Sequence, residues 1–522
     1  MNGAVAAGHP LTAEAGARIL AEGGNAVDAC VAAALVAWVA ESPLTGPGAG
    51  GFMLVHRARD RSDRLLDCFV AAPGRGLRAG ERAAMRAVDV HFDQRASQVF
   101  LIGAASVAVP GAPAGLEVAH RRYGRLPWGE LFPPAIEAAR QGVRLNDGQA
   151  FLADILDPIL RSEPEGRRVY GAERPLREGE EVVMADLAGT LEWLAAEGTG
   201  VLYRGELARR LSEAVLAGGG RVTEEDLAAY RVITRRPVRA PYREAEFVSN
   251  PPPSSGGLLI AFALRVLEGL GPPRPAGSAG ALAALAEAMR EASLLRGRGF
   301  LGLLRRGGAA GRVLSDEHVE EAVRSARAGH GRPAREPVGL PSTTHVSVVD
   351  ARGDAASYSS STGCGSGLFV PGTGIQLNNM LGEPDLNPDG RAAAPGARLT
   401  SMMAPSIVLR GGRPRLVVGS AGSIRLRAAI LQTVVNVVDH GLPVDEAIRA
   451  PRAHLEDGVL QLEGGVDPRA ADALEDGGYA VERWGGRNLY FGGASAVGVR
   501  PDGTLEAAGD PRRGGAGAVV AP

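Results

Sequence analysis

The 522-residue sequence contains no lysine, and all 57 of its basic residues are arginines. Schiff-base catalysis, pyridoxal-phosphate enzymes and Walker-type phosphate loops each depend on a lysine amine, so the sequence excludes these classes. Codon bias explains the missing lysine better than function does. Acidic residues number 59, and the net charge of −2 provides no field that would attract nucleic acid or an anionic membrane surface. We therefore expect neither as a partner.

Cysteine is also scarce, with only Cys30, Cys68 and Cys364 in the chain. These three residues lie far apart and form no CxxC pair, which argues against zinc, iron–sulfur and thioredoxin-like sites and against a disulfide framework. No cluster of His, Asp and Glu has the spacing of metal ligands. We expect neither a metal nor another cofactor.

Long apolar runs are missing as well. The longest, residues 29–40, has 12 residues between Asp28 and Glu41 and is too short to span a bilayer, so it is predicted to form a buried helix. Asn25, with Asp28 three positions later, is typical of a helix start. Residues 1–10 lack a basic segment followed by an apolar one, so a cytoplasmic location is the expectation.

The length predicts one large layered unit or two to three domains. Residues 112–235 and 258–328 alternate helical stretches with turns, residues 329–342 are linker-like, and the chain after them is strand-like. The glycine-rich segment 42–51 precedes a strand at 52–55 and opens no helix, so we interpret it as a close-packed turn rather than a phosphate-binding loop.

Two β-type runs, 343–350 and 355–361, are joined by a short segment that includes Ala351, Arg352 and Gly353, which predicts a hairpin. If Asp350 faces Asp354 across the loop, Thr343 lies opposite Ser361, whereas a two-residue loop would place it opposite Thr362. In either register two hydroxyl side chains are close enough to hydrogen-bond.

Thr343 is the best candidate nucleophile. An internal threonine hydroxyl needs a neighbouring base, and neither a Ser-His-Asp order nor a GxSxG motif is present. If the chain is cut between Ser342 and Thr343, the new α-amino group has a reference pKa of about 7.7–8.0 and can deprotonate the hydroxyl of its own residue. On spacing alone, however, an ordinary threonine-rich strand would explain the pattern.

Motifs along most of the chain favour the catalytic interpretation of Thr343 over an ordinary strand residue. Together they resemble the γ-glutamyltranspeptidases, which are N-terminal nucleophile hydrolases. The segments that carry the resemblance are HPLTAEAGARILAEGGNAVDACVAAAL (9–35), GPGAGGFMLV (46–55), VPGAPAGLEVAHRRYGRLPW (109–128), TEEDLAAYRV (223–232), PPPSSGG (251–257), TTHVSVVD (343–350), GIQLNNM (374–380), TSMMAPSIV (400–408) and GSAGSIR (419–425).

The resemblance implies an α+β fold of four layers, αββα, and a proenzyme that cuts itself into residues 1–342 and 343–522, which stay together as a heterodimer. Thr343 matches the family's catalytic threonine, and Ser361 matches a second threonine that hydrogen-bonds to it. Gly422 and Ser423 match the pair whose backbone N–H groups form the oxyanion hole. The implied activity is cleavage of γ-glutamyl amide bonds, with water, an amino acid or a peptide as acceptor.

The residues implied to bind substrate are Arg78, with Arg75 as a substitute, and Thr400, Ser401, Asn379 and Glu383. Several family features are changed here. The residues around Pro73 differ, an expected Asn is missing after Ser361, Met380 stands where glutamine is usual, and Glu383 replaces an aspartate. Because each unpaired polar group removes about 1–3 kcal/mol of discrimination, an acylase for a non-glutamyl acyl group is the first alternative. An unprocessed, non-catalytic homologue is the second.

Two further side chains near the predicted site are given structural roles. His345 shares a strand face with Thr343, yet we interpret it as a packed histidine. Cys364 has no paired base, which argues against a thiol nucleophile.

Overall fold

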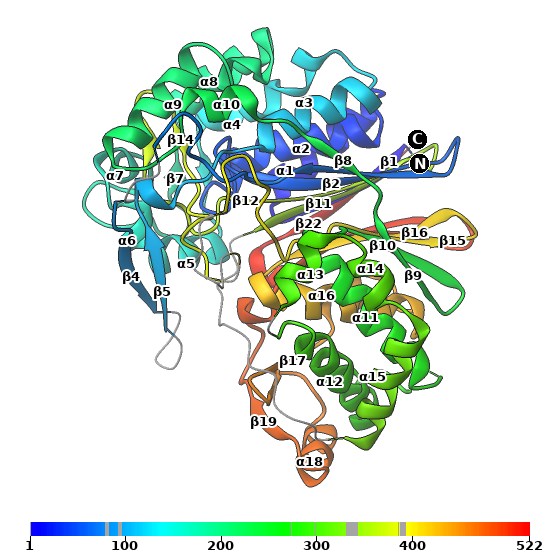
Figure 1. Ribbon diagram of the computed structural model, residues 1–522. Coiled ribbons are helices and arrows are strands. Elements are labelled where there is room, and N and C mark those ends of the chain that lie inside the picture. The colour runs from blue at the N-terminus through cyan, green and yellow to red at the C-terminus, as the bar shows by residue number, and fades with distance from the viewer. Residues whose placement is uncertain are drawn as a thin grey trace.

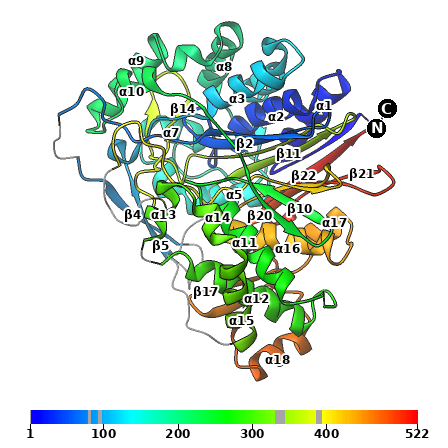
Figure 2. The same ribbon diagram turned by 45° about the vertical axis from the view of Figure 1, so that its right-hand side comes forward.

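The computed structural model describes residues 2–78, 83–91, 97–272, 274–297, 299–329, 343–384, 386 and 393–521. Two β-sheets pack face to face, and each is covered on its outer side by helices (Figures 1 and 2). The four-layer α+β sandwich that the resemblance implied is confirmed. The chain termini lie beside each other because β1 (Gly3–Ala7) pairs with β22 (Ala516–Val520).

The first sheet has seven strands in the order β22-β1-β11-β12-β2-β3-β8. Besides β1 and β22, its strands are β2 (Gly50–Arg57), β3 (Ser62–Cys68), β8 (Ile233–Arg235), β11 (Thr344–Asp350) and β12 (Ala355–Ser361). The second sheet has six strands, β21-β20-β16-β15-β10-β9. They are β9 (Val238–Tyr242), β10 (Ala245–Ser249), β15 (Ser406–Arg410), β16 (Arg413–Ala421), β20 (Gly493–Val499) and β21 (Leu505–Gly509).

Helices form the two outer layers of the fold, and they include those predicted from the sequence. Those associated with the first sheet are α1 (Pro10–Ala21), α2 (Ala26–Ala40), α3 (Ala112–Tyr123), α4 (Pro133–Gln141), α5 (Asp147–Ile155), α6 (Asp157–Leu160), α7 (Pro164–Tyr170), α8 (Ala185–Glu197), α9 (Glu206–Ala217) and α10 (Glu224–Ala229). Those on the side of the second sheet are α11 (Gly256–Gly269), α12 (Ala279–Leu294), α13 (Phe300–Arg306), α14 (Ala309–Val313), α15 (Asp316–Ala328), α16 (Leu426–Val438), α17 (Val444–Arg449) and α18 (Pro468–Asp476). Small strand pairs complete the fold: β4 (Arg86–His91) with β5 (Ser97–Ile102), β6 (Val143–Arg144) with β7 (Glu181–Val182), β13 (Phe369–Val370) with β14 (Ile375–Gln376), and the sheet of β17 (Ala453–Glu456), β18 (Val459–Leu462) and β19 (Ala480–Arg483).

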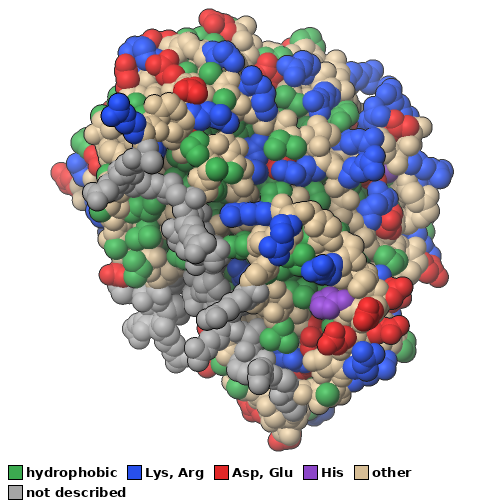
Figure 3. Space-filling view, in the orientation of Figure 1, with side chains coloured by type: hydrophobic (Ala, Val, Ile, Leu, Met, Phe, Trp, Pro, Cys, Tyr) green, Lys and Arg blue, Asp and Glu red, His purple; other side chains and the backbone are tan. Residues whose placement is uncertain are grey.

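Helix α2 is the buried helix predicted from residues 29–40, and all of its residues are buried. The predicted start is confirmed: the Asn25 side chain accepts from the N–H groups of Val27 and Asp28, and Asp28 accepts from the Asn25 N–H in return. In the part of the chain that the structure describes, no helix is long and apolar enough to cross a bilayer. On the face seen in Figure 3, arginine side chains are scattered and mixed with acidic ones.

The hairpin of β11 and β12 has the predicted register. Thr344 pairs with Ser360 and Val349 with Ala355, and the Asp350 N–H donates to the Asp354 carbonyl. Continuing this register places Thr343 opposite Ser361. Strand alternation then decides which face each residue occupies: the imidazole of His345 lies against Gly419 of the second sheet. Thr343 shares that inner face, whereas Thr344 faces the helical layer.

The two predicted fragments interleave in both sheets. Residues 1–342 supply β1, β2, β3 and β8 to the first sheet, while residues 343–522 supply β11, β12 and β22. The second sheet combines β9 and β10 with four strands from the second fragment. The fragments are therefore not separate folding units. The predicted cut stays a prediction, and Ser342 lies outside the described residues.

Candidate active site

The candidate nucleophile, Thr343, immediately precedes β11 and is only 6 % exposed. Its register neighbour Ser361 ends β12, and the Ser361 Oγ accepts a hydrogen bond from the Gly363 N–H at 2.8 Å. This bond holds the turn that follows β12. The structure thus brings Thr343 and Ser361 together on the ends of adjacent strands, as the hairpin prediction required.

Gly422 and Ser423 form a tight turn between β16 and the helical segment η4 (Ser423–Arg425), which leads into α16. Gly422 has φ = 136° and Ser423 has φ = 50°. A left-handed serine costs on the order of 1–3 kcal/mol, and such strain is concentrated at functional turns. Ser423 lines a cavity that Thr343 also lines, which agrees with the oxyanion-hole position that the family resemblance implied for this turn.

A cavity of about 60 Å³, which we call the front cavity, opens beside Thr343 and Ser423. Its lining is mainly apolar, contributed by Phe69, Met380, Leu386, Met402, Met403 and Leu426. Glu383 is its one charged side chain among the residues that the structure describes. Among the residues that the structure describes, the lining of the front cavity includes no arginine.

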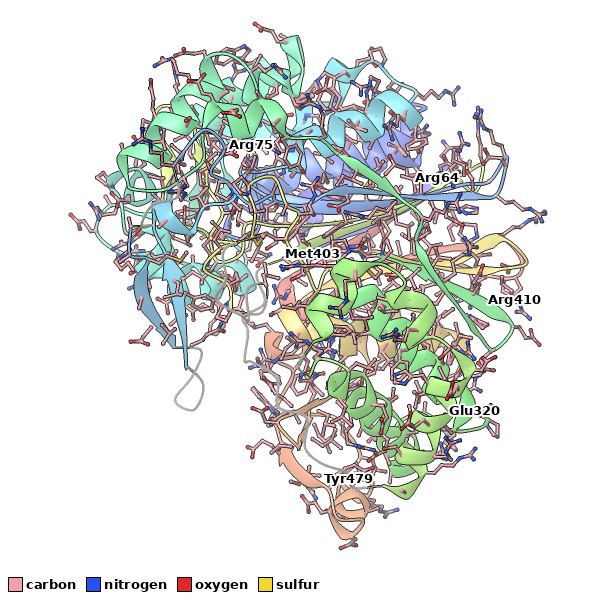
Figure 4. All side chains as sticks on the ribbon, in the orientation of Figure 1. Arg64, Arg75, Glu320, Met403, Arg410 and Tyr479 are labelled. Carbon is pink, nitrogen blue, oxygen red and sulfur yellow. The ribbon has the colours of Figure 1, made fainter. Side chains whose placement is uncertain are left out.

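Arg78 and Arg75, the predicted carboxylate-binding arginines, are not brought to this cavity. Arg78 is exposed, and its carbonyl accepts a bond from Arg221. The Arg75 guanidinium lies against Gly396, and in Figure 4 Arg75 is labelled in the upper part of the molecule while Met403 is near the centre. Their predicted role in binding substrate stays a prediction.

The predicted pair Thr400 and Ser401 lies next to the front cavity. Thr400 Oγ1 donates to the Leu386 carbonyl at 3.2 Å, and Ser401 Oγ accepts from the Met403 N–H at 3.0 Å. Ser401 lines the cavity, and its carbonyl accepts from Ser254 Oγ at 2.8 Å. The PPPSSGG motif therefore helps to hold the Ser401 backbone in place.

Asn379 and Glu383 take different positions. The Asn379 amide accepts from the Cys364 N–H at 3.0 Å and donates to the Cys364 sulfur at 2.9 Å, so it supports the turn after β12 from behind. Glu383 lines the front cavity beside Gly363. Of these two predicted substrate-binding residues, the structure brings only Glu383 to the cavity.

The structural roles given to His345 and Cys364 are confirmed. The two ring nitrogens of His345 hydrogen-bond to Ser359 at 2.8 Å and Ser347 at 2.9 Å, and burial lowers the pKa of the imidazole to about 3. Burial raises the pKa of the Cys364 thiol well above its usual value. We therefore interpret both as buried structural groups, with the imidazole neutral and the thiol protonated.

A second group of residues near Thr343 was not predicted from the sequence. A cavity of about 20 Å³, which we call the rear cavity, also reaches Thr343 and is lined by polar groups that include Glu41, Thr344, Gln149 and Arg513. In the sequence, Glu41 stands out only as the residue that follows the apolar run 29–40. Met402 and Met403 were missed as well, although they directly follow Thr400 and Ser401 in the sequence.

A buried threonine at the head of a central strand, between two sheets that are enclosed by helices, is the arrangement of the N-terminal nucleophile hydrolases. Comparison with known proteins narrows the class. The family model for gamma-glutamyltranspeptidase matches residues 12–520, and the chain belongs to that family. It is an enzyme of the γ-glutamyltransferase-like amidohydrolase class.

Its similar proteins include both acylases and glutathione hydrolases. The Acylase ACY 1 proenzyme of Pseudomonas sp. (strain SE83) is 35 % identical, with 97 % of this chain and 91 % of that protein covered. The glutathione hydrolase proenzyme of Escherichia coli (strain K12) is 33 % identical, with coverages of 98 % and 90 %. Among solved structures, cephalosporin acylase from Bacillus halodurans has a TM-score of 0.84 at 27 % identity, covering 99 % of this chain and 95 % of that one.

Proposed function

We propose that Thr343 becomes an amino-terminal residue by self-cleavage and then serves as the nucleophile of an amidohydrolase. Its buried hydroxyl, opposite Ser361 and beside the Gly422–Ser423 turn, is the arrangement that supports this proposal. In the cleavage step, the Thr343 hydroxyl attacks the carbonyl carbon of residue 342, the 342–343 C–N bond breaks, and the proton of the hydroxyl passes to the Thr343 nitrogen. This step leaves residue 342 as an ester on Thr343 and frees the α-amino group. Water then hydrolyses the ester and releases the carboxylate of residue 342.

In turnover, this amino group takes the proton of the Thr343 hydroxyl as the oxygen attacks the substrate amide carbon. The N–H groups of Gly422 and Ser423 stabilise the oxyanion. When the C–N bond breaks, the α-ammonium returns its proton to the leaving amine. Water, or an amine acceptor, then attacks the acyl-enzyme ester and releases Thr343.

For the substrate, we propose an amide whose acyl group is largely apolar. The observation that supports this choice is the front cavity, where six apolar side chains line the space beside Thr343. An apolar acyl group would gain from burial against these side chains, whereas a free carboxylate would lose hydration beside them. The relatives named as acylases agree with this proposal.

Hydrolysis of a γ-glutamyl amide is the second candidate. Glu383 and Ser401 line the front cavity and offer partners for a substrate ammonium and carboxylate. The relative named glutathione hydrolase supports this candidate.

A panel of p-nitroanilides distinguishes the two. We expect kcat/KM for hexanoyl- or phenylacetyl-p-nitroanilide to exceed that for γ-glutamyl-p-nitroanilide by at least tenfold, and the reverse order would support the second candidate. Intact mass spectrometry should find two fragments that meet between residues 342 and 343. Thr343→Ala should give one uncut, inactive chain, whereas Thr343→Ser should retain some cleavage. An active, uncut wild-type chain would refute the proposal.

A further inference from the structure

Glu41 is a buried carboxylate that the mechanism above does not use. It directly follows α2 and is 4 % exposed. Thr12 Oγ1 of α1 donates to its Oε1 at 2.9 Å, and Thr344 Oγ1 of β11 donates to its Oε2. One carboxylate therefore joins two helices to the first residue of the strand that carries the candidate nucleophile.

The surrounding backbone is shaped for this carboxylate. A Cβ on Gly8 would lie 2.2 Å from Glu41 Oε2 and 3.1 Å from Thr344 Oγ1, so no larger residue fits there without displacing the contact. Glu41 also lines the rear cavity together with Thr343. Thr344 and Thr343 face opposite sides of the sheet, so the hydrogen bond from Thr344 links Glu41 to the nucleophile through the backbone of β11.

We propose that Glu41 is a positioning residue for Thr343, because its carboxylate fixes Thr344, the only covalent tether that Thr343 would retain after self-cleavage. The inference rests on the proposed function. Before the cut, Thr343 is held by the chain on both sides. After the cut, the position of its amino group and hydroxyl depends on the anchoring of its single neighbour. Misplacement of a reacting group by about 1 Å lowers turnover about a hundredfold.

The contacts select the ionised form of Glu41. Two hydroxyl groups donate to its two oxygens, which suits a carboxylate, whereas a protonated carboxyl would direct its own O–H toward one of these donors. Burial raises the pKa of Glu41 to about 7, although the bonds from Thr344 and Thr12 and the charge of Arg513 oppose this shift. The carboxylate form, to which both hydroxyl groups donate, therefore becomes populated as the pH rises through neutrality.

The other titratable groups around Glu41 do not change state in this range. Burial lowers the pKa of His9, at the start of α1, to about 4, and that of His345, on β11, to about 3. Burial lowers the pKa of Arg513, in the segment η6 (Pro511–Arg513), to about 10. Burial opposes ionisation of Asp510, but Arg452 and Arg512 hold its pKa below the usual value.

The test compares variants on the two sides of Glu41. Thr344→Val keeps the shape of the side chain and removes the hydroxyl on β11, and Thr12→Val does the same on α1 as the matched control. Rates are normalised to the burst of p-nitroaniline, so only cut, active enzyme is counted. We expect Thr344→Val to lower kcat at least tenfold with KM changed less than threefold. Thr12→Val should change kcat less than threefold, and Thr344→Ser should restore most of the activity.

The pH profile supplies the readout that a purely structural role would not change. On the acid side, log(kcat/KM) of the wild type should rise with a slope approaching 2, because Glu41 and the Thr343 amine must both lose a proton. Glu41→Gln should reduce this slope to 1. A slope of 1 in both proteins, or equal kcat losses in Thr344→Val and Thr12→Val, would overturn the inference. An active Thr343→Ala would instead refute the proposed function itself.

Discussion

The front cavity and the rear cavity meet at Thr343 but are built from different residues. In front, methionine, leucine and phenylalanine side chains surround the proposed acyl position. Behind, Glu41, Thr344, Gln149 and Arg513 lie beside apolar residues such as Leu44 and Leu152, and the Glu41 carboxylate accepts a hydrogen bond from Thr344. Apolar side chains tolerate exchange at modest cost, whereas loss of a partner leaves a buried polar group unsatisfied. We therefore expect substitutions in front to change substrate choice, and substitutions at the contact between Glu41 and Thr344 to change the placement of Thr343.

The largest expected effect is a loss of stability when the buried ion pairs behind Thr343 are broken. Asp510 accepts from Arg452 Nη2 at 2.6 Å and from Arg512 Nη1 at 3.1 Å, with all three side chains almost fully buried. Asp510→Asn leaves Arg452 without a carboxylate partner and should lower the stability by about 3–5 kcal/mol. Thermal unfolding of Asp510→Asn against the wild type measures this loss.

Asp445→Asn is the matched control, because Asp445 pairs with Arg449 on the surface, where both side chains are more than half exposed. It should cost less than about 1 kcal/mol. Equal unfolding temperatures for the two variants would show that the cluster behind Thr343 is no more sensitive than the surface.

A smaller, pH-dependent effect is expected from His9. Burial lowers its pKa to about 4, so unfolding at acid pH lets the imidazole bind a proton that the folded state excludes. The stability that this histidine contributes is full above pH 6.5 and is lost as the pH falls toward 4, by up to about 3 kcal/mol.

His9→Asn keeps an acceptor for the Leu11 N–H at the start of α1 and cannot titrate. The unfolding temperature of this variant should therefore fall less than that of the wild type between pH 7 and pH 4.5. Parallel pH profiles of the two proteins would contradict the burial of a neutral His9.

Substitutions in the front cavity should change substrate specificity rather than stability. Met380→Gln introduces a polar amide into an apolar lining. It should lower kcat/KM for the hexanoyl substrate about tenfold relative to γ-glutamyl-p-nitroanilide, because a buried amide without a partner costs roughly 1–3 kcal/mol. Met380→Leu keeps the lining apolar and should leave the ratio nearly unchanged. An unchanged ratio in Met380→Gln would place the acyl group elsewhere.

The smallest effect on activity is expected at Cys364. This residue follows β12 of the hairpin, but it is buried and burial raises the pKa of its thiol. Cys364→Ser keeps a group that can accept from the Asn379 amide. Activity should stay within about twofold of the wild type, and iodoacetamide should not inhibit the native enzyme. Rapid inactivation by iodoacetamide would show that the thiol is accessible.

Local rules predicted the parts of the molecule that depend on near neighbours. The capping of α2 by Asn25, the loop between Asp350 and Asp354, and the resulting register of Thr343 all follow from residues close together in the chain. The four-layer αββα arrangement was predicted from the resemblance to the family. These elements carry the candidate nucleophile and its hydroxyl neighbour.

The cavities could not be predicted in this way, because each gathers residues from distant segments. The front cavity combines Phe69 with Met403 and Leu426, and the rear cavity combines Glu41 with Thr344 and Arg513. A charged residue at the end of a helix, such as Glu41, is indistinguishable in sequence from a solvated one. Arg78 shows the opposite case. It occupies a position that matches the family, but its side chain is exposed and does not line the front cavity.

The interleaved strands have a consequence for the lifetime of the cut enzyme. The 343–522 chain occupies the middle and one edge of the first sheet and most of the second, so it could leave its companion only by dismantling both sheets at once. Dilution alone should therefore never dissociate the pair. Hydrolysis of the proposed bond before Thr343 would create a new reactive end, and we expect the molecule still to melt as a single unit.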